Sequence, residues 1–174
     1  MTTAVEPGSP GDLPLTGGTR IRSRSWWALF AAGLVAAAGW YAAHPAPLPS
    51  DGSVAAQTAA GTPVTLGVLS VDDRAVELRE VGWDRSALGA GDELTAHVCR
   101  GGSVSATRDP SAFCTSVVPA EGTTLRPGDQ LVLEVVAEEP GRLVLEGLRV
   151  AYRDGWQWGE QQAGRTVEVV ITER

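Results

Sequence analysis

The sequence predicts a mainly β fold, a two-layer sandwich that follows a single transmembrane helix. An uncharged stretch of eighteen residues, from Trp26 to Ala43, predicts the helix. Beyond residue 63, short apolar runs alternate with polar residues and are separated by Gly, Pro and Asp, which predicts strands. We therefore expect a disordered tail at 1–25, a transmembrane helix at 26–43, a linker at 44–62 and an exported β domain at 63–174.

The chain is acidic on one side of the apolar stretch. All fourteen basic residues are arginine, and the formal net charge is −7. Residues 44–174 carry eleven arginines against nineteen acidic side chains, which is a net charge of −8. Such a domain repels phosphate backbones, so the sequence predicts no nucleic-acid partner. Anionic lipid surfaces are disfavoured as direct ligands of this domain for the same reason.

The apolar stretch has the length and the aromatic ends of a membrane span. At 1.5 Å per residue it covers about 27 Å, close to the ~30 Å hydrocarbon core of a bilayer. Trp26 and Trp27 lie at one end and Trp40 and Tyr41 at the other. Such amphipathic rings prefer the boundary between headgroups and acyl chains. These four residues are the predicted membrane anchor, and the lipid bilayer is the predicted partner of residues 26–43.

Arginines flank the apolar stretch on one side only. Arg20, Arg22 and Arg24 precede it, and the twenty residues after it contain neither Arg nor Lys. Basic residues near a span are retained in the cytoplasm, so the sequence predicts a single-pass plasma-membrane protein. Its N-terminus is expected inside, and its C-terminal domain outside. The tail at 1–25 is rich in Pro, Gly, Thr and Ser, so we expect it to be disordered.

A cleaved signal peptide is the alternative interpretation of the same stretch. A basic start, an apolar segment and the small residues Ala36, Ala37 and Ala38 are all present. The continuation to Trp40 and Tyr41 favours a retained signal-anchor, because the apolar region of a signal peptide usually has about 7 to 15 residues. A secreted form of the same domain remains the alternative.

The residues after the apolar stretch have the composition of a spacer. Proline alternates with other residues at 45–49, and the rest of 44–62 is rich in Ala, Ser, Gly and Gln. Proline at this density favours an extended conformation of about 3.1 Å per residue. The sequence therefore predicts a linker that holds the folded domain away from the membrane.

About seven strands are expected in the region 63–174. They share period-two alternation, which is clearest at Leu131, Leu133 and Val135, and no segment has a convincing helical period. Such a number of short strands in about 110 residues is typical of an immunoglobulin-like (Ig-like) β-sandwich, which is the predicted fold. The expected strands are 64–71, 75–83, 93–100, 114–119, 130–137, 143–153 and 156–172, the last with a break at 159–164.

Two turns and one hairpin carry a resemblance to known proteins. Gly91-Asp92 and Gly128-Asp129 each precede an alternating strand, and Tyr152-Arg153-Asp154-Gly155 leads into a hairpin. With an export anchor in front, this arrangement resembles the membrane-anchored envelope proteins of actinobacteria that carry an exported Ig-like domain and are mostly uncharacterised. The resemblance covers residues 63–172. It implies a fold class and transfers no active site.

Cys99 and Cys114 are the only cysteines, and both lie in the part of the chain expected outside the cell. That environment is oxidising, so we expect a disulfide between them. Closing the loop constrains the unfolded chain by roughly 3 kcal/mol in the chain-entropy model. Their spacing differs from the Cys-x-x-Cys of redox-active pairs, so the bridge is predicted to be structural.

The sequence holds no catalytic motif and no evident set of metal ligands. His44 and His97 are the only histidines, and Gly-x-Ser-x-Gly, His-Glu-x-x-His and phosphate-binding glycine loops are absent. We therefore predict no catalytic residue, no metal and no cofactor. Calcium stays a hypothesis for acidic pairs that could converge at turns: Asp72-Asp73, Asp92-Glu93 and Glu138-Glu139.

The last hairpin is the candidate binding surface. Asp154-Gly155 between apolar runs predicts a type I′ turn, which pairs Arg153 with Trp156 and, further along, Ala151 with Trp158. Two indoles beside a guanidinium can stack on a sugar ring or receive a side chain of a partner. The alternative is that a bulge rotates both tryptophans into the core, or that a loop covers their face. The same turn pairs Tyr152 with Gln157 and Arg149 with Glu160. Alternation then puts Leu148, Val150 and Tyr152 on one face, and the candidate surface on the other comprises Arg149, Arg153, Trp156, Trp158 and Glu160.

These features predict a non-enzymatic binding or assembly module of the cell envelope, with an envelope protein or glycan as its partner. The alternative function is an envelope hydrolase, or another enzyme, that uses scattered carboxylates.

Overall fold

The structure is a computed structural model that describes residues 22–174 except 85, 87 and 90. By their contacts the residues fall into two compact units, 1–38 and 39–174. Most of the predicted tail, including Arg20, lies outside the described residues. Arg22 and Arg24 belong to the first turn of helix α1 (Arg22–Ala42), so this helix begins before the expected boundary at residue 26.

Helix α1 carries large apolar side chains that are exposed. Trp27, Leu29 and Val35 are 69%, 71% and 73% exposed. They project in different directions, because successive residues of an α-helix are rotated by about 100°. Within the described part of the chain, no helix combines the length and the mean hydropathy that a membrane-spanning segment requires.

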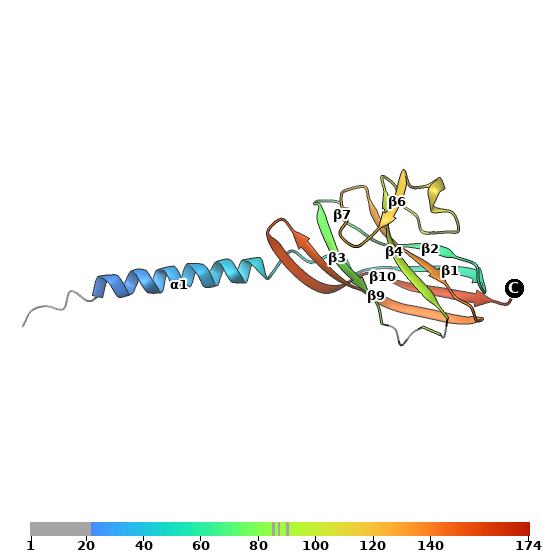
Figure 1. Ribbon diagram of the computed structural model, residues 1–174, viewed down its shortest axis with the longest axis horizontal. Coiled ribbons are helices and arrows are strands. Elements are labelled where there is room, and N and C mark those ends of the chain that lie inside the picture. The colour runs from blue at the N-terminus through green and yellow to red at the C-terminus, as the bar shows by residue number, and fades with distance from the viewer. Residues whose placement is uncertain (1–21, 85, 87, 90) are drawn as a thin grey trace, which may run out of the picture. The chain divides into compact units, whose positions relative to one another are not determined.

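In the part of the chain that the structure describes, ten strands form two five-stranded sheets, which confirms a mainly β fold with the layers of a sandwich (Figure 1). All neighbouring strands are antiparallel except β1 and β10, which are parallel. The first sheet has the order β1 (Ser53–Ala59), β10 (Gln157–Thr172), β9 (Gly141–Asp154), β3 (Val76–Gly82) and β7 (Thr124–Leu125). The second has the order β5 (Ala106–Thr107), β2 (Val64–Ser70), β8 (Gln130–Val136), β4 (Glu93–Arg100) and β6 (Ser116–Pro119).

The expected number of strands was too low, because β1, β5 and β7 were not predicted. β5 and β7 have two residues each, too few to show alternation in the sequence. The break expected at 159–164 is also wrong, because β10 continues through it. The pairing of β10 with β9 shifts register only between Ala163 and Thr166, where Gly164 has a φ of 84°. An irregularity of this kind bends a strand without ending it.

The hydrophobic core lies between the two sheets. The alternation that predicts β8 places Leu131, Leu133 and Val135 in this core, and all three are fully buried. Burying such a side chain stabilises the fold by about 1.5 to 3 kcal/mol. Both sheets contribute the largest fully buried side chains, which are Leu66, Leu78, Leu125, Leu131, Leu133 and Leu148.

The disulfide between Cys99 and Cys114 is confirmed, and it is buried. With Val104 and Val132 the two cysteines form a second, small apolar cluster. Gln130 is buried beside it, and its Oε1 accepts a hydrogen bond of 2.7 Å from the N–H of Val104. The bridge thus helps the loop at 100–113 to cover the face of β8 that points away from the main core.

Asp129 joins the end of β4 to the turn before β8. Its carboxylate lies 2.5 Å from Nη1 of Arg100 and accepts hydrogen bonds from the N–H groups of Gly101, at 3.0 Å, and Arg126, at 3.2 Å. Burial raises the pKa of this carboxyl, but the hydrogen bonds and the positive charge of Arg100 outweigh burial, so the pKa is lowered overall. The carboxylate is therefore held in its charged form.

Residues 44–62 are not a free linker, in contrast to the prediction. Strand β1 pairs with β10 from Ser53, opposite Thr166, to Ala59, opposite Thr172. Its side chains at Val54 and Thr58 are buried. The expected domain boundary at residue 63 therefore lies too late in the chain. An alanine-rich strand with weak alternation depends on its neighbour, here β10, for its hydrogen bonds.

Candidate functional site

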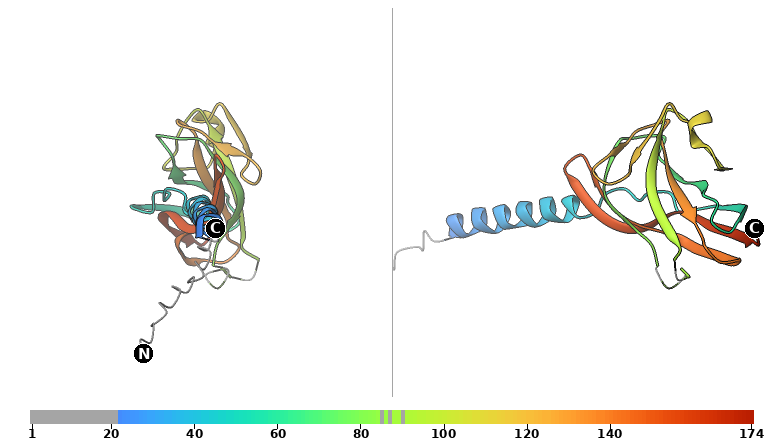
Figure 2. Two further views of the ribbon diagram at one scale, coloured as in Figure 1. Left: turned by 90° about the vertical axis from the view of Figure 1, so that its left-hand side faces the viewer. Right: turned by 45° about the vertical axis from the view of Figure 1, so that its right-hand side comes forward.

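Strands β9 and β10 form a long hairpin whose end extends past the other strands of its sheet (Figure 2). Its turn consists of Gly155 and Trp156, because Asp154 pairs with Gln157. Gly155 has a φ of 59°, and Trp156 does not have a positive φ. This pattern fits a type II′ turn, which has glycine at its first central position, whereas a type I′ turn requires positive φ at both central positions.

The predicted register of this hairpin is wrong by two residues, because the turn lies one residue later than expected. Arg153 pairs with Trp158 rather than Trp156, and Ala151 pairs with Glu160 rather than Trp158. Since the error is even, every side chain keeps its predicted face. The other two corrected pairs are Tyr152 with Gly159 and Arg149 with Gln162.

The two faces of the hairpin differ in exposure. Val150 and Tyr152 are buried in the core. Trp156 and Trp158 are 54% and 61% exposed. The alternative in which both tryptophans are core residues is therefore wrong.

Charged side chains accompany the two indoles. Arg149 and Glu160 form an ion pair across the hairpin, with Nε 3.5 Å from Oε1. Both are largely exposed, so the pair adds at most about 1 kcal/mol of stability. Arg153, opposite Trp158, donates a hydrogen bond of 2.7 Å to the carbonyl of Gly155. We call the exposed set the outer hairpin face: Arg149, Arg153, Trp156, Trp158 and Glu160.

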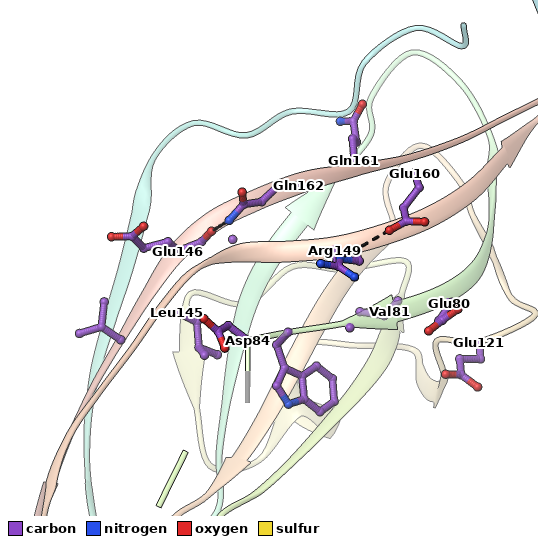
Figure 3. Close-up of a pocket in the computed structure, with 14 residues that line it drawn as sticks. Glu80, Val81, Asp84, Glu121, Leu145, Glu146, Arg149, Glu160, Gln161 and Gln162 are labelled. Carbon is purple, nitrogen blue, oxygen red and sulfur yellow. Dashed lines mark hydrogen bonds and ion pairs between the residues drawn. The ribbon is translucent and has the colours of Figure 1, made fainter. Parts of the chain in front are cut away.

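A broad groove of about 1180 Å³ adjoins this face, and Arg149 and Glu160 line both (Figure 3). Trp83 lies in its wall. Most of its charged side chains are acidic. The N–H and hydroxyl of Ser86 donate hydrogen bonds that lower the pKa of one of them, Asp84. The other acidic side chains of the groove are Glu80, Glu121, Glu146 and Glu160.

The four predicted anchor residues are exposed aromatic side chains of α1. Trp26 and Trp27 lie towards its start, and Trp40 and Tyr41 lie in its last turn. The ring centroid of Tyr41 is 5.0 Å from that of Trp156. The sequence predicted a membrane role for Tyr41 and a binding role for Trp156, and it did not predict that the two rings meet.

The segment after α1 is held by side chains of the β domain. Tyr152 donates a hydrogen bond of 2.9 Å from its hydroxyl to the carbonyl of Ala46. Nη2 of Arg74 donates to the carbonyls of Ala46, at 2.9 Å, and Pro47, at 2.8 Å. A proline-rich segment has no internal hydrogen bonds, so its carbonyl groups are available for such contacts.

The carbonyl groups of Leu48 and Pro49 also accept hydrogen bonds from the β domain. Gln161 donates a hydrogen bond of 3.1 Å from Nε2 to the carbonyl of Leu48, and the N–H of Gly164 donates one of 2.8 Å to the carbonyl of Pro49. The side chain of Leu48 is buried in the main core. Four consecutive carbonyl groups, at 46–49, are therefore bonded to the β domain. We call residues 44–49 the docked segment.

Sequence reasoning missed this docking, although Gly159 signals it. A glycine inside a strand often marks the close approach of another part of the chain. A Cβ atom at Gly159 would lie 2.7 Å from Cγ of Pro45, which is closer than real Cβ contacts allow.

The remaining polar candidates lie elsewhere in the fold. His97 Nε2 is 3.5 Å from Oε2 of Glu134 on the neighbouring strand. Asp92 accepts a hydrogen bond of 3.3 Å from the N–H of Glu138, so two of the three acidic turns meet. Among the residues described, no three His, Cys, Asp or Glu side chains are grouped so that they could hold a metal ion.

No protein-family model matches this chain, and no curated protein is similar to it in sequence. Its function is therefore inferred from the outer hairpin face, the groove and the docked segment.

Proposed function

We propose that this chain is a non-enzymatic binding or assembly module of the cell envelope. The observation that carries the proposal is the outer hairpin face, which exposes two indoles and the Arg149–Glu160 pair beside the groove. Large aromatic side chains are costly to leave in water, and they are enriched among the residues that dominate binding energies. The outer hairpin face is the contact surface in this proposal.

The module is anchored in the plasma membrane by residues 26–43. No described helix combines the length and mean hydropathy of a membrane span, so the support for this anchor comes from the exposed apolar side chains on all sides of α1, because a helix that is apolar all round requires an apolar environment. Arg20, Arg22 and Arg24 favour a cytoplasmic N-terminus and an extracytoplasmic β domain. A disulfide fits the oxidising environment outside the cell.

The β domain is Ig-like in this proposal. Ig-like sandwiches place their second, fifth and fourth strands in one sheet and their third, sixth and seventh strands in the other. Without the short strands β5, β6 and β7, the orders β2-β8-β4 and β3-β9-β10 follow that rule. The disulfide differs from the antibody pattern, because here it joins β4 to the loop before β6 instead of bridging the two sheets.

The side chains that line the groove indicate which kind of partner the contact surface would bind. Its acidic side chains and Trp83 suit a partner that presents hydroxyl groups or positive charge, since carboxylates accept hydrogen bonds and an indole offers a stacking face. An envelope glycan or a basic protein segment meets this description.

The proposal is tested with a photo-cross-linking side chain at Glu160 of the full chain in its native membrane. We expect a discrete adduct with an envelope protein or glycan. The matched control has the same probe at Phe113, which is also exposed but lies in the disulfide loop. The same adducts at both positions, or none at Glu160, would contradict the proposed surface.

Orientation is tested separately with a reporter fused after Arg174. We expect activity only when the reporter is outside the cytoplasm. Cytoplasmic activity would overturn the anchor and its direction, whatever the cross-linking result.

A further inference from the structure

The docked segment keeps the hairpin close to the end of α1. The helix ends at Ala42, and Ala46 is bonded to Tyr152 of β9 and to Arg74. Four residues span at most roughly 14 Å, even when fully extended. The β domain therefore stays close to Ala42 as long as these hydrogen bonds hold.

The hairpin turn itself contacts the residues around the end of α1. Trp156 lies 5.0 Å from Tyr41 between ring centroids. Gln157 donates hydrogen bonds from Nε2 to the carbonyls of Tyr41, at 2.7 Å, and His44, at 3.4 Å. The ring of His44 is stacked on that of Trp40 at 3.9 Å. The hairpin turn thus contacts the helix end through one aromatic pair, Tyr41 with Trp156, and through the side chain of Gln157, all within the unit 39–174.

The distance between the rings of Tyr41 and Trp156 is no greater than the thickness of a headgroup layer. A hydrocarbon core of about 30 Å within a bilayer of about 40 to 45 Å leaves roughly 5 to 8 Å on each side. If Tyr41 marks this layer, as the proposed anchor implies, a ring 5.0 Å away at Trp156 lies in it or at its border. Trp158 follows on the same exposed face of the hairpin.

The chemistry of the hairpin turn fits the same layer. Indole rings combine an apolar body with a polar N–H and prefer the membrane interface. Arg153, opposite Trp158, offers a guanidinium group that suits a lipid phosphate. The neighbouring Asp154 is paired with Arg74, Nε to Oδ2 3.1 Å, and Arg74 also lies 3.6 Å from Asp73, so the negative charge of Asp154 is partly compensated. The net charge of −8 over residues 44–174 opposes a wider contact with anionic lipid, which confines the contact to the turn.

We propose that Trp156 and Trp158 insert into the headgroup layer of the bilayer that holds residues 26–43, with Arg153 beside the lipid phosphates. This inference rests on the proposed membrane anchor and assigns the lipid surface to one end of the outer hairpin face. Arg149, Glu160 and the groove remain for the envelope partner. The β domain lies against the membrane instead of standing away from it.

The test is the fluorescence of the full chain in phosphatidylcholine vesicles whose acyl chains carry bromine, a contact quencher, near the headgroups. In the reporting variant, phenylalanine replaces four of the six tryptophans, so that only Trp156 and Trp158 emit. We expect a blue shift and a loss of emission relative to vesicles without bromine. Both should persist at high salt, because the contact is mainly aromatic and not ionic.

Two matched variants make every outcome decisive. A chain that keeps only Trp83, in the groove, should retain its emission, and quenching there equal to that of the turn would overturn a contact confined to Trp156 and Trp158. A chain that keeps only Trp40 reports on the anchor. Quenching of Trp40 with an unquenched turn overturns the inference and leaves the anchor standing. Quenching of neither overturns both. Quenching of the turn alone contradicts the anchor and therefore also overturns the inference, because the bilayer it names is the one that holds residues 26–43.

Discussion

Tyr152 and Ala46 are joined by a hydrogen bond of 2.9 Å, although 106 positions of the chain separate them. The ring of Tyr152 is buried in the core, and burial raises the pKa of its phenol, so the hydroxyl remains a donor at neutral pH. Together with the neighbouring contacts, this bond makes the start of the supposed linker a part of the β domain.

Replacing Tyr152 with phenylalanine should weaken the docked segment. The change leaves the buried ring in place and removes the hydroxyl, which lies within hydrogen-bond distance of the carbonyl of Ala46 and of Oε1 of Gln161, so we expect the free energy of unfolding to fall by about 1 kcal/mol. Limited proteolysis within 44–52 should become faster. Tyr41→Phe is the matched control, because its side chain is exposed, and it should change neither quantity. Equal behaviour of the two variants would mean that the docked segment does not depend on Tyr152.

A methyl group at Gly159 should also displace the docked segment. Gly159→Ala places a Cβ against Pro45, and such overpacking typically costs about 1 to 3 kcal/mol. We expect lower stability in denaturant and faster cleavage within 44–52. Gly141→Ala is the control. Gly141 lies in the same hairpin, and a Cβ there would have no atom within 4 Å. If Gly159→Ala were as stable as Gly141→Ala, Pro45 would not be held against β10.

Because of Asp129, the free energy of unfolding should fall at acid pH. Its pKa is lower in the folded state than the ordinary value of about 3.9, so its contribution is present above that value. The contribution is lost as pH falls through the lower pKa of the folded state. Asp129→Asn should cost about 1.5 to 3 kcal/mol at neutral pH, because Arg100 loses its charged partner, and less at low pH.

The measurement for Asp129 is the free energy of unfolding in denaturant from neutral to acid pH. The variant should show a flatter acid dependence than the unmodified chain. Asp51→Asn, at an exposed position, should follow the unmodified chain. Parallel acid dependences of all three proteins would refute the assignment to Asp129.

Removing the disulfide should destabilise the β domain without disturbing the outer hairpin face. The bridge closes a loop with a sequence separation of 15, so the double variant Cys99→Ser with Cys114→Ser should lose roughly 3 kcal/mol. A reductant should lower the stability of the unmodified chain by a similar amount and have no effect on the double variant. Peptide mapping without reduction that finds two alkylatable thiols would contradict the bridge.

The sequence by itself determined which residues of each long strand share a face. Alternation put Leu131 and Leu133 on one face of β8, and it put Tyr152 of β9 on the face opposite Trp156 and Trp158, whose exposure in the structure identifies the outer face. These predictions held despite a register error of two, because the direction of a side chain depends on the local backbone period and survives an even shift. All five residues of the outer hairpin face were predictable for this reason.

Only the tertiary structure decided which segments lie against one another. The docked segment, the parallel pairing of β1 with β10, the contact of Tyr41 with Trp156 and the groove join parts of the chain that are far apart in sequence. A carbonyl group at Ala46 has the same local chemistry whether it faces water or the hydroxyl of Tyr152. Its partner is set by the packing of the two sheets. This packing brings Tyr152 to Ala46, and the residues next to Ala46 in the sequence do not indicate which group it will contact.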